Sequence, residues 1–228
     1  MPRFLSIVLV LCLGAGFAAA ATINASDLTT GSTTVNIGWA TATADPRAFQ
    51  GKTLAGYYGV GIKDGYVDGE IDLAGESIRI DFKSPTIISQ ITLGFLFQAG
   101  NYGDVVSEVA SVQYSDTPNW AADYLSAQTA TQANWSGPGT VTNLSPGVQP
   151  DAGVWRINNP FGNQAVSFLE FTPVQVGGPK APTDNRNSDF AFMSLSGTTA
   201  TPEPSTWSML GLSLTGLAAA IRRRSSGW

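Results

Sequence analysis

The chain has 228 residues, a net charge of −5, no histidine and a single cysteine, Cys12. The lack of histidine excludes a Ser-His-Asp triad and removes the most common general base and the usual ligands of zinc and copper. The acidic balance argues against nucleic-acid binding, which needs clustered lysine and arginine. Any catalysis would therefore rest on carboxylates, lysine or tyrosine, and we expect a protein that is not an enzyme.

Residues 1–21 have the pattern of a secretory signal peptide. Arg3 supplies a positive charge, residues 4–17 are apolar, and the run Ala18–Ala21 offers small residues for cleavage after Ala20 or Ala21. Cleavage would remove Cys12, which leaves the mature chain without a disulfide, a thiolate nucleophile or a cysteine metal site. The sequence thus predicts export through the inner membrane.

Residues 22–200 form the predicted body, whose length suits one domain. The seventeen acidic residues of the chain less Glu203, and the twelve basic ones less Arg3 and the three C-terminal arginines, leave the body a net charge of −8. The simplest interpretation of this negative charge is that it keeps the exported protein soluble outside the cell.

Alternating apolar and polar residues predict that this body is all-β. Residues 77–82 alternate cleanly, Ser84-Pro85 interrupts the run, and residues 86–97 resume it. Period-two patterns separated by Gly, Pro, Asn and Asp are typical of an antiparallel β-sandwich, here jelly-roll-like. Further strands are predicted at 33–39, 105–114, 139–144, 153–158, 165–171 and 189–196.

Two segments of the body depart from this pattern. Residues 119–132 are the one predicted helix, because Trp120, Tyr124 and Ala127 lie at helical spacing. Residues 172–188, rich in Pro, Gly and Asn, are predicted to form a long loop between the last strands.

The densest acidic group comprises Asp64, Asp68, Glu70 and Asp72, in a glycine-rich region. The last three would share one face of a strand, where their repulsion would favour a cation or solvent. Ca²⁺ takes six to eight oxygen ligands, which closely spaced carboxylates and loop carbonyls can supply. The spacing does not match an EF-hand loop, so both a solvated acidic loop and a structural Ca²⁺ site stay open; no other cofactor is expected.

Aromatic residues in predicted loops form a second candidate group. Trp135 lies in a turn-like sequence and is the aromatic residue that we expect to be most exposed, with Tyr57 and Tyr58 as companions. Exposed Trp and Tyr pair an apolar face with a polar tip and can stack on a sugar ring. The alternative is that they cap the core of the sandwich.

Residues 201–228 combine three features: Pro202-Glu203-Pro204, an uncharged apolar run over 207–221, and the cluster Arg222-Arg223-Arg224. The apolar run with its arginines predicts a short transmembrane helix whose C-terminus stays in the cytoplasm. The pattern resembles the PEP-CTERM sorting signal of Gram-negative bacteria. That resemblance implies recognition by an exosortase, transient attachment to the inner membrane, and cleavage near Pro202-Glu203-Pro204.

The middle of the body has a looser resemblance of its own. Residues 59–65, 70–72 and 76–82 are similar to a segment of exported PEP-CTERM proteins that look like jelly rolls of the galactose-binding or discoidin type. The resemblance bears on the fold and not on the activity.

These observations together predict an exported protein of the cell surface or of an extracellular, exopolysaccharide or biofilm matrix, with polysaccharide as a ligand. The alternative is a carboxylate-dependent, glycan-active enzyme. A pair such as Asp68 and Glu70 would then have to face each other across a groove, at the separation that a glycoside hydrolase requires.

Overall fold

The computed structural model describes residues 20–116, 119–147, 152–177, 184 and 186–199. Within these ranges the chain is all-β, with thirteen strands, one short 3₁₀ helix and no α-helix. The elements are β1 (Ala20–Asn24), η1 (Ala25–Asp27), β2 (Thr34–Asn36), β3 (Ala40–Asp45), β4 (Phe49–Leu54), β5 (Tyr57–Ile62), β6 (Ser77–Gly94), β7 (Val109–Asp116), β8 (Asn119–Thr129), β9 (Gln132–Trp135), β10 (Thr140–Asn143), β11 (Trp155–Asn158), β12 (Ala165–Pro173) and β13 (Ala191–Thr199).

Strand β6 organises the fold because it belongs to two layers. Its first half pairs with β3 and β12, and its second half pairs with β13 and β11. The register of β12 on β6 shifts between Val166 and Phe168, opposite the Ser84-Pro85 step. The interruption that the sequence predicts at Ser84-Pro85 is thus a local irregularity, and β6 runs through it as one strand. Bends and bulges of this kind let one strand pass from sheet to sheet.

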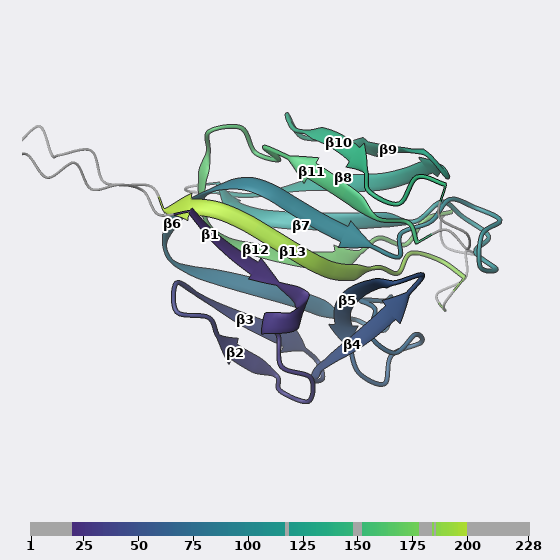
Figure 1. Cartoon of the computed structure of the whole chain (residues 1–228), viewed down its shortest axis with the longest axis horizontal. Coiled ribbons are helices and arrows are strands. Elements are labelled where there is room, and N and C mark those ends of the chain that lie inside the picture. The colour runs from purple at the N-terminus through teal and green to yellow at the C-terminus, as the bar shows by residue number, and fades with distance from the viewer. Residues whose placement is uncertain (1–19, 117–118, 148–151, 178–183, 185, 200–228) are drawn as a thin grey trace, which may run out of the picture. The chain divides into compact units, whose positions relative to one another are not determined.

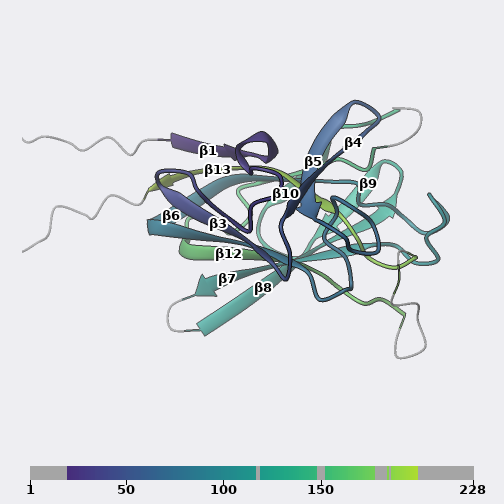
Figure 2. The same cartoon turned by 90° about the horizontal axis from the view of Figure 1, so that it is seen from below.

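Two layers of antiparallel strands result (Figures 1 and 2). One follows the order β2-β3-β6-β12-β7-β8-β9, and the other contains β4, β5, β13, the second half of β6, β11 and β10, with β1 on β13. Figure 2 shows β1 and β13 on one side and β12, β7 and β8 on the other. This arrangement agrees with the predicted all-β, antiparallel architecture.

The core fills the space between the layers with alternate residues of each strand. β3 contributes only alanines to it, and β6 contributes Ile78 and Ile80. The largest fully buried side chains include Trp155 and a set of phenylalanines, so bulky residues on some strands face small ones on others. The phenylalanines with no exposed surface are Phe49, Phe95, Phe171, Phe190 and Phe192.

The predicted helix at 119–132 is wrong, because this segment forms the β8–β9 hairpin. Residues 119–126 of β8 pair with β7, and Leu125 and Ala127 point into the core. Trp120 and Tyr124, which suggested a helical period, instead lie on the opposite, outward side of the strand. Pairing with two neighbouring strands overrides a weak local pattern of four-residue spacing.

The predicted ends of the body meet the structure only in part. Ala20 and Ala21 already pair with Thr198 and Gly197 in the β1–β13 ladder, so the predicted cleavage falls at the first residues of β1. The rest of the predicted signal peptide and residues 201–228, including the predicted transmembrane helix, lie outside the described residues. Within the described part, no helix has the length and apolar character needed to span a membrane.

Candidate functional site

The structure does not bring together the four acidic residues predicted to bind Ca²⁺. Asp64 and Asp68 are exposed in the turn after β5, where the Asp64 N–H donates to Asp68 Oδ1 at 2.6 Å. Glu70 and Asp72 are buried but have separate partners. Across the residues that the structure describes, no three carboxylate, cysteine or histidine side chains are arranged to hold a metal ion.

Asp72 is occupied by the turn that surrounds it. Its Oδ2 accepts hydrogen bonds from the Tyr66 and Val67 N–H groups, and its Oδ1 accepts one from Ala74 at 2.8 Å. The Asp72 N–H donates in turn to Glu76, whose other oxygen pairs with Arg47 at 2.7 Å. Burial raises the pKa of Glu76 to about 7, against the opposing effect of Arg47. The hydrogen bonds of the Asp72 carboxylate therefore order the turn around it, as those of buried polar groups commonly do.

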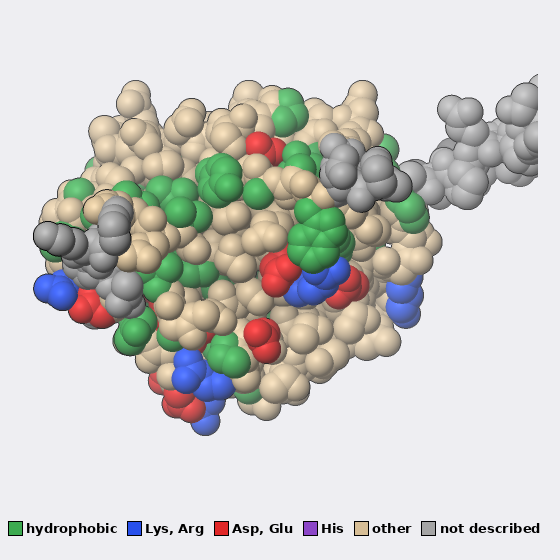
Figure 3. Space-filling model, turned by 180° about the vertical axis from the view of Figure 1, so that it is seen from behind, with side chains coloured by type: hydrophobic (Ala, Val, Ile, Leu, Met, Phe, Trp, Pro, Cys, Tyr) green, Lys and Arg blue, Asp and Glu red, His purple; other side chains and the backbone are tan. Residues whose placement is uncertain are grey.

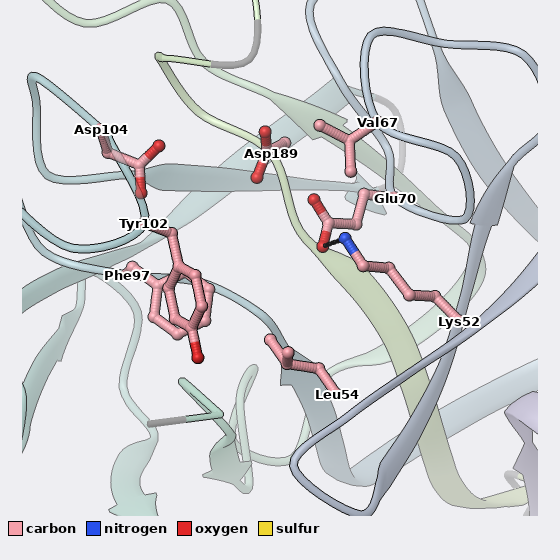
Figure 4. Close-up of a pocket in the computed structure, with 8 residues that line it drawn as sticks. All are labelled: Lys52, Leu54, Val67, Glu70, Phe97, Tyr102, Asp104 and Asp189. Carbon is pink, nitrogen blue, oxygen red and sulfur yellow. Dashed lines mark hydrogen bonds and ion pairs between the residues drawn. The ribbon is translucent and has the colours of Figure 1, made fainter. Parts of the chain in front are cut away.

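Glu70 enters a different cluster, at a pocket of about 210 Å³ (Figure 4). Lys52 of β4 donates to Glu70 Oε1 at 2.6 Å, and Asp189 and Asp104 lie on the far side of Glu70. The remaining walls are apolar or aromatic and include Phe97 and Tyr102. We call this group the acidic pocket; its lining residues are Lys52, Leu54, Val67, Glu70, Phe97, Tyr102, Asp104 and Asp189.

A fourth carboxyl group, Glu108, is fully buried and neighbours Asp189 and Asp104 of the acidic pocket. Its Oε2 accepts a hydrogen bond from the Phe97 N–H, whereas among the described residues no donor reaches its Oε1. Burial and the neighbouring Asp189 and Asp104 raise the pKa of Glu108 well above its usual value. A protonated Glu108 can donate to Asp189, which removes the cost of an unpaired buried charge.

The other carboxyl groups of the acidic pocket respond to the same burial. Desolvation and then the charge of Glu70 raise the pKa of Asp189 to about 9 and that of Asp104 to about 6. Desolvation also raises the pKa of Glu70, and Lys52 opposes that shift. The acidic pocket therefore holds protons at neutral pH. Sequence reasoning missed Asp104, Glu108 and Asp189, because they come from distant segments and only the fold joins them.

The carboxylate pair named in the enzyme hypothesis lies in two different environments. Asp68 is exposed and bonded to the Asp64 N–H, while Glu70 is buried and paired with Lys52. Glycoside hydrolysis needs two carboxyl groups that face each other across the scissile bond. The arrangement of these two residues thus gives the enzyme hypothesis no support.

The aromatic side chains that were predicted to be exposed divide between core and surface. Trp135 is only 7% exposed, its Nε1 donates to the Pro160 carbonyl at 3.1 Å, and its ring meets Phe161, so the prediction that it is exposed was wrong. The Tyr57 hydroxyl donates to the Leu144 carbonyl at 2.7 Å, and the residue packs on a small cluster under β13. Tyr58 is 43% exposed, which agrees with the prediction, but it has no exposed aromatic neighbour on its strand.

Two exposed aromatic residues lie together on β8. Trp120 is 66% exposed and Tyr124 is 44% exposed, on the same side of the strand. The Trp120 ring meets Phe168 edge-on at 5.1 Å between centroids, and the Arg79 guanidinium covers Phe168 at 3.8 Å. Trp120 therefore packs on Phe168 and Arg79 on one side while the rest of its ring is exposed to solvent.

Charged and polar side chains of the same sheet surround Trp120. Arg79 is paired on both sides, with Asp81 at 2.9 Å and with Glu170 at 3.4 Å. Figure 3 looks onto this side of the molecule and shows a large hydrophobic side chain beside cationic and acidic ones, on a surface of mostly uncharged groups. We call this surface the outer face. The strand register adds to it Thr41 and Thr43 of β3, Gln113 and Ser115 of β7, and Ala122 of β8.

Comparison with known proteins identifies the C-terminal segment. The family model for the PEP-CTERM protein-sorting motif matches residues 200–224. The range contains Pro202, Glu203 and Pro204 together with Arg222, Arg223 and Arg224, as predicted. The motif implies export, sorting to the cell envelope or surface, and processing by an exosortase. No curated protein matches the chain.

Proposed function

We propose that this protein is a non-enzymatic component of the surface or extracellular matrix of a Gram-negative bacterium, and that its outer face binds polysaccharide. The sorting motif supports the location, since it directs the chain to the cell envelope or surface. The composition of the outer face supports the ligand class: aromatic rings for stacking, with hydroxyl, amide and carboxylate groups around them.

The observation that carries this proposal is the position of Trp120. A large indole ring that stays two-thirds exposed gains little for folding, and such residues mark binding surfaces when polar groups surround them. Its contacts with Phe168 and Arg79 fix the ring before any ligand arrives. A fixed ring loses less conformational entropy on binding than a mobile one.

Tyr124 extends the same surface along β8. It lies four residues from Trp120 on an extended strand, which corresponds to about 14 Å at ~3.4 Å per residue. Two stacking points at this separation suit a chain of several sugar units better than a single monosaccharide. We therefore expect affinity to rise with the length of the oligosaccharide.

The test compares polysaccharide binding by the purified exported protein and its variants. Trp120→Ala is expected to weaken binding about 30-fold, as truncation of a central Trp commonly costs ~2 kcal/mol. Tyr124→Ala is expected to have a smaller effect. Tyr66→Ala, which removes an exposed aromatic ring outside the outer face, serves as the matched control. Equal affinities for wild type and Trp120→Ala would refute the proposed site.

Two further measurements test the proposed location and the proposed lack of catalytic activity. Intact mass of the protein from membrane and culture-fluid fractions, in hosts with and without exosortase, is expected to show loss of the C-terminal tail only when exosortase is present. Incubation with polysaccharide is expected to leave its chain length unchanged. Shortened products formed by the wild-type protein would revive the enzyme hypothesis.

A further inference from the structure

A concave surface lies at the other end of β8 from Trp120. It has a volume of about 420 Å³ and is lined by the β8–β9 hairpin together with β10 and Trp155 of β11. Gln128, on its rim, is eight residues from Trp120, or roughly 27 Å along an extended strand. We call this surface the amide groove.

The amide groove carries no charged side chain. Its polar lining consists of four carboxamides, from Gln128, Gln132, Asn134 and Asn143, and the hydroxyl of Thr131. A carboxamide offers two donors and an acceptor on one planar group, which matches neighbouring hydroxyl groups of a sugar. With neither cation nor anion in the wall, an acidic or basic ligand would lose its hydration without a counter-charge.

Two of the carboxamides are fixed and two are free to bind. Asn143 Nδ2 donates to the Ala130 carbonyl at 3.0 Å, and its Oδ1 accepts from the Ser145 N–H at 2.8 Å, so it ties β10 to the β8–β9 turn. Gln128 Nε2 donates to Ser126 Oγ at 2.8 Å. Within the described part of the chain, the exposed side chains of Gln132 and Asn134 form no hydrogen bond.

The base of the amide groove is rigid. Trp155, one of its lining residues, is almost fully buried, and its Nε1 donates to the Leu96 carbonyl at 2.9 Å, which holds the side chain in place. A rigid apolar base with free amides on its rim has the composition of a preformed site for a polar, uncharged molecule.

We infer that the amide groove is a second binding site, for an uncharged, hydroxyl-rich saccharide, and that Gln132 and Asn134 supply its hydrogen bonds. The site rests on the groove alone. Its consequence rests also on the proposed function: with the outer face as a first site, one molecule can hold two polysaccharide chains and cross-link them. Two sites on one molecule would raise the apparent affinity for long chains well above that for short ones.

Calorimetric titration of the purified exported protein with short neutral oligosaccharides tests the site. We expect about two binding events per chain for wild type and about one for the double variant Gln132→Ala, Asn134→Ala, whose loss of two hydrogen bonds weakens that site about tenfold or more. Gln175→Ala removes an exposed carboxamide outside the groove and is the matched control. A single event for wild type, unchanged in the double variant, would overturn the inference.

A second measurement separates this inference from the proposed function. Trp120→Ala is expected to abolish the event at the outer face and to leave the one at the amide groove. The turbidity of a solution of neutral polysaccharide is expected to rise when wild-type protein is added. It is expected not to rise with Trp120→Ala or with the double variant Gln132→Ala, Asn134→Ala, because each has lost one of the two sites. If Trp120→Ala abolishes all saccharide binding, the outer face is the one binding site and the inference about the amide groove is contradicted. Stronger binding of a charged oligosaccharide to the groove would contradict the ligand class.

Discussion

Replacement of Asp189 by asparagine tests the reasoning about the acidic pocket. The pKa of Asp189 is about 9 in the folded protein, because the carboxyl group is desolvated and lies beside Glu70. In the unfolded chain an aspartate has a pKa of about 3.9. Between these values the folded state keeps a proton that the unfolded state has released, so stability is complete below about pH 4 and falls as pH rises towards about 9.

The size of the effect follows from that one proton. Each bound proton changes the free energy of unfolding by about 1.4 kcal/mol per pH unit, so Asp189 alone removes about 4 kcal/mol between pH 5 and pH 8. Asparagine keeps the shape of a protonated aspartate and can still donate to Glu70 and accept from Glu108. Asp189→Asn is therefore expected to make the slope of the unfolding free energy against pH shallower by about 1.4 kcal/mol per pH unit, which corresponds to one proton.

Urea unfolding at a series of pH values between 5 and 8 measures this decline. Asp184→Asn is the control, since the hydrogen bond from Arg186 lowers the pKa of the half-buried Asp184 and keeps it ionised across that range. Its slope is expected to equal that of wild type. The reasoning is refuted if Asp189→Asn has the same slope as wild type, or if wild-type stability rises with pH.

Three further predictions concern the acidic pocket and the core between the layers. Lys52→Met leaves the Glu70 carboxyl without its ion pair and is expected to lower the free energy of urea unfolding by roughly 3 kcal/mol. The loss is expected to be smaller in acid, where Glu70 is protonated. Equal losses at all pH values would contradict this prediction. Gly61→Ala places a Cβ against the Glu70 backbone and is expected to cost roughly 1–3 kcal/mol, read from the urea midpoint, whereas an unchanged midpoint would show that the backbone adjusts freely. Leu169→Ala opens a cavity between the layers and is expected to cost roughly 2–5 kcal/mol with an unchanged m-value; a changed m-value would point to altered compactness instead.

The strands with sustained alternation or long apolar runs were the ones that sequence could predict. β6, β12 and β13 carry sustained alternation or long apolar runs, because one or both faces are buried. β3 escaped prediction since its inward residues are alanines, which carry little hydrophobic signal. The β8–β9 hairpin was mistaken for a helix for a related reason: its inward residues are few and its largest side chains point outward.

The candidate sites were beyond prediction for two reasons. Trp135 and Trp120 both occur among turn-like or polar neighbours, and only the packing of Phe161 over one and the openness around the other distinguish them. Asp68 and Glu70 are close in sequence but differ completely in burial. The partners of Glu70, including Asp104 and Asp189, come from distant segments that no local pattern connects.

The sequence alone determined where this protein is sent and its broad class. The sorting motif at 200–224 is a contiguous signal, read by its order of residues, and period-two alternation reflects burial of one face of each strand. The tertiary structure alone decided which acids share protons, which tryptophan is exposed and where amides line a groove. These properties depend on contacts between residues far apart in the chain, and desolvation, hydrogen bonding and exposure are fixed only when those contacts form.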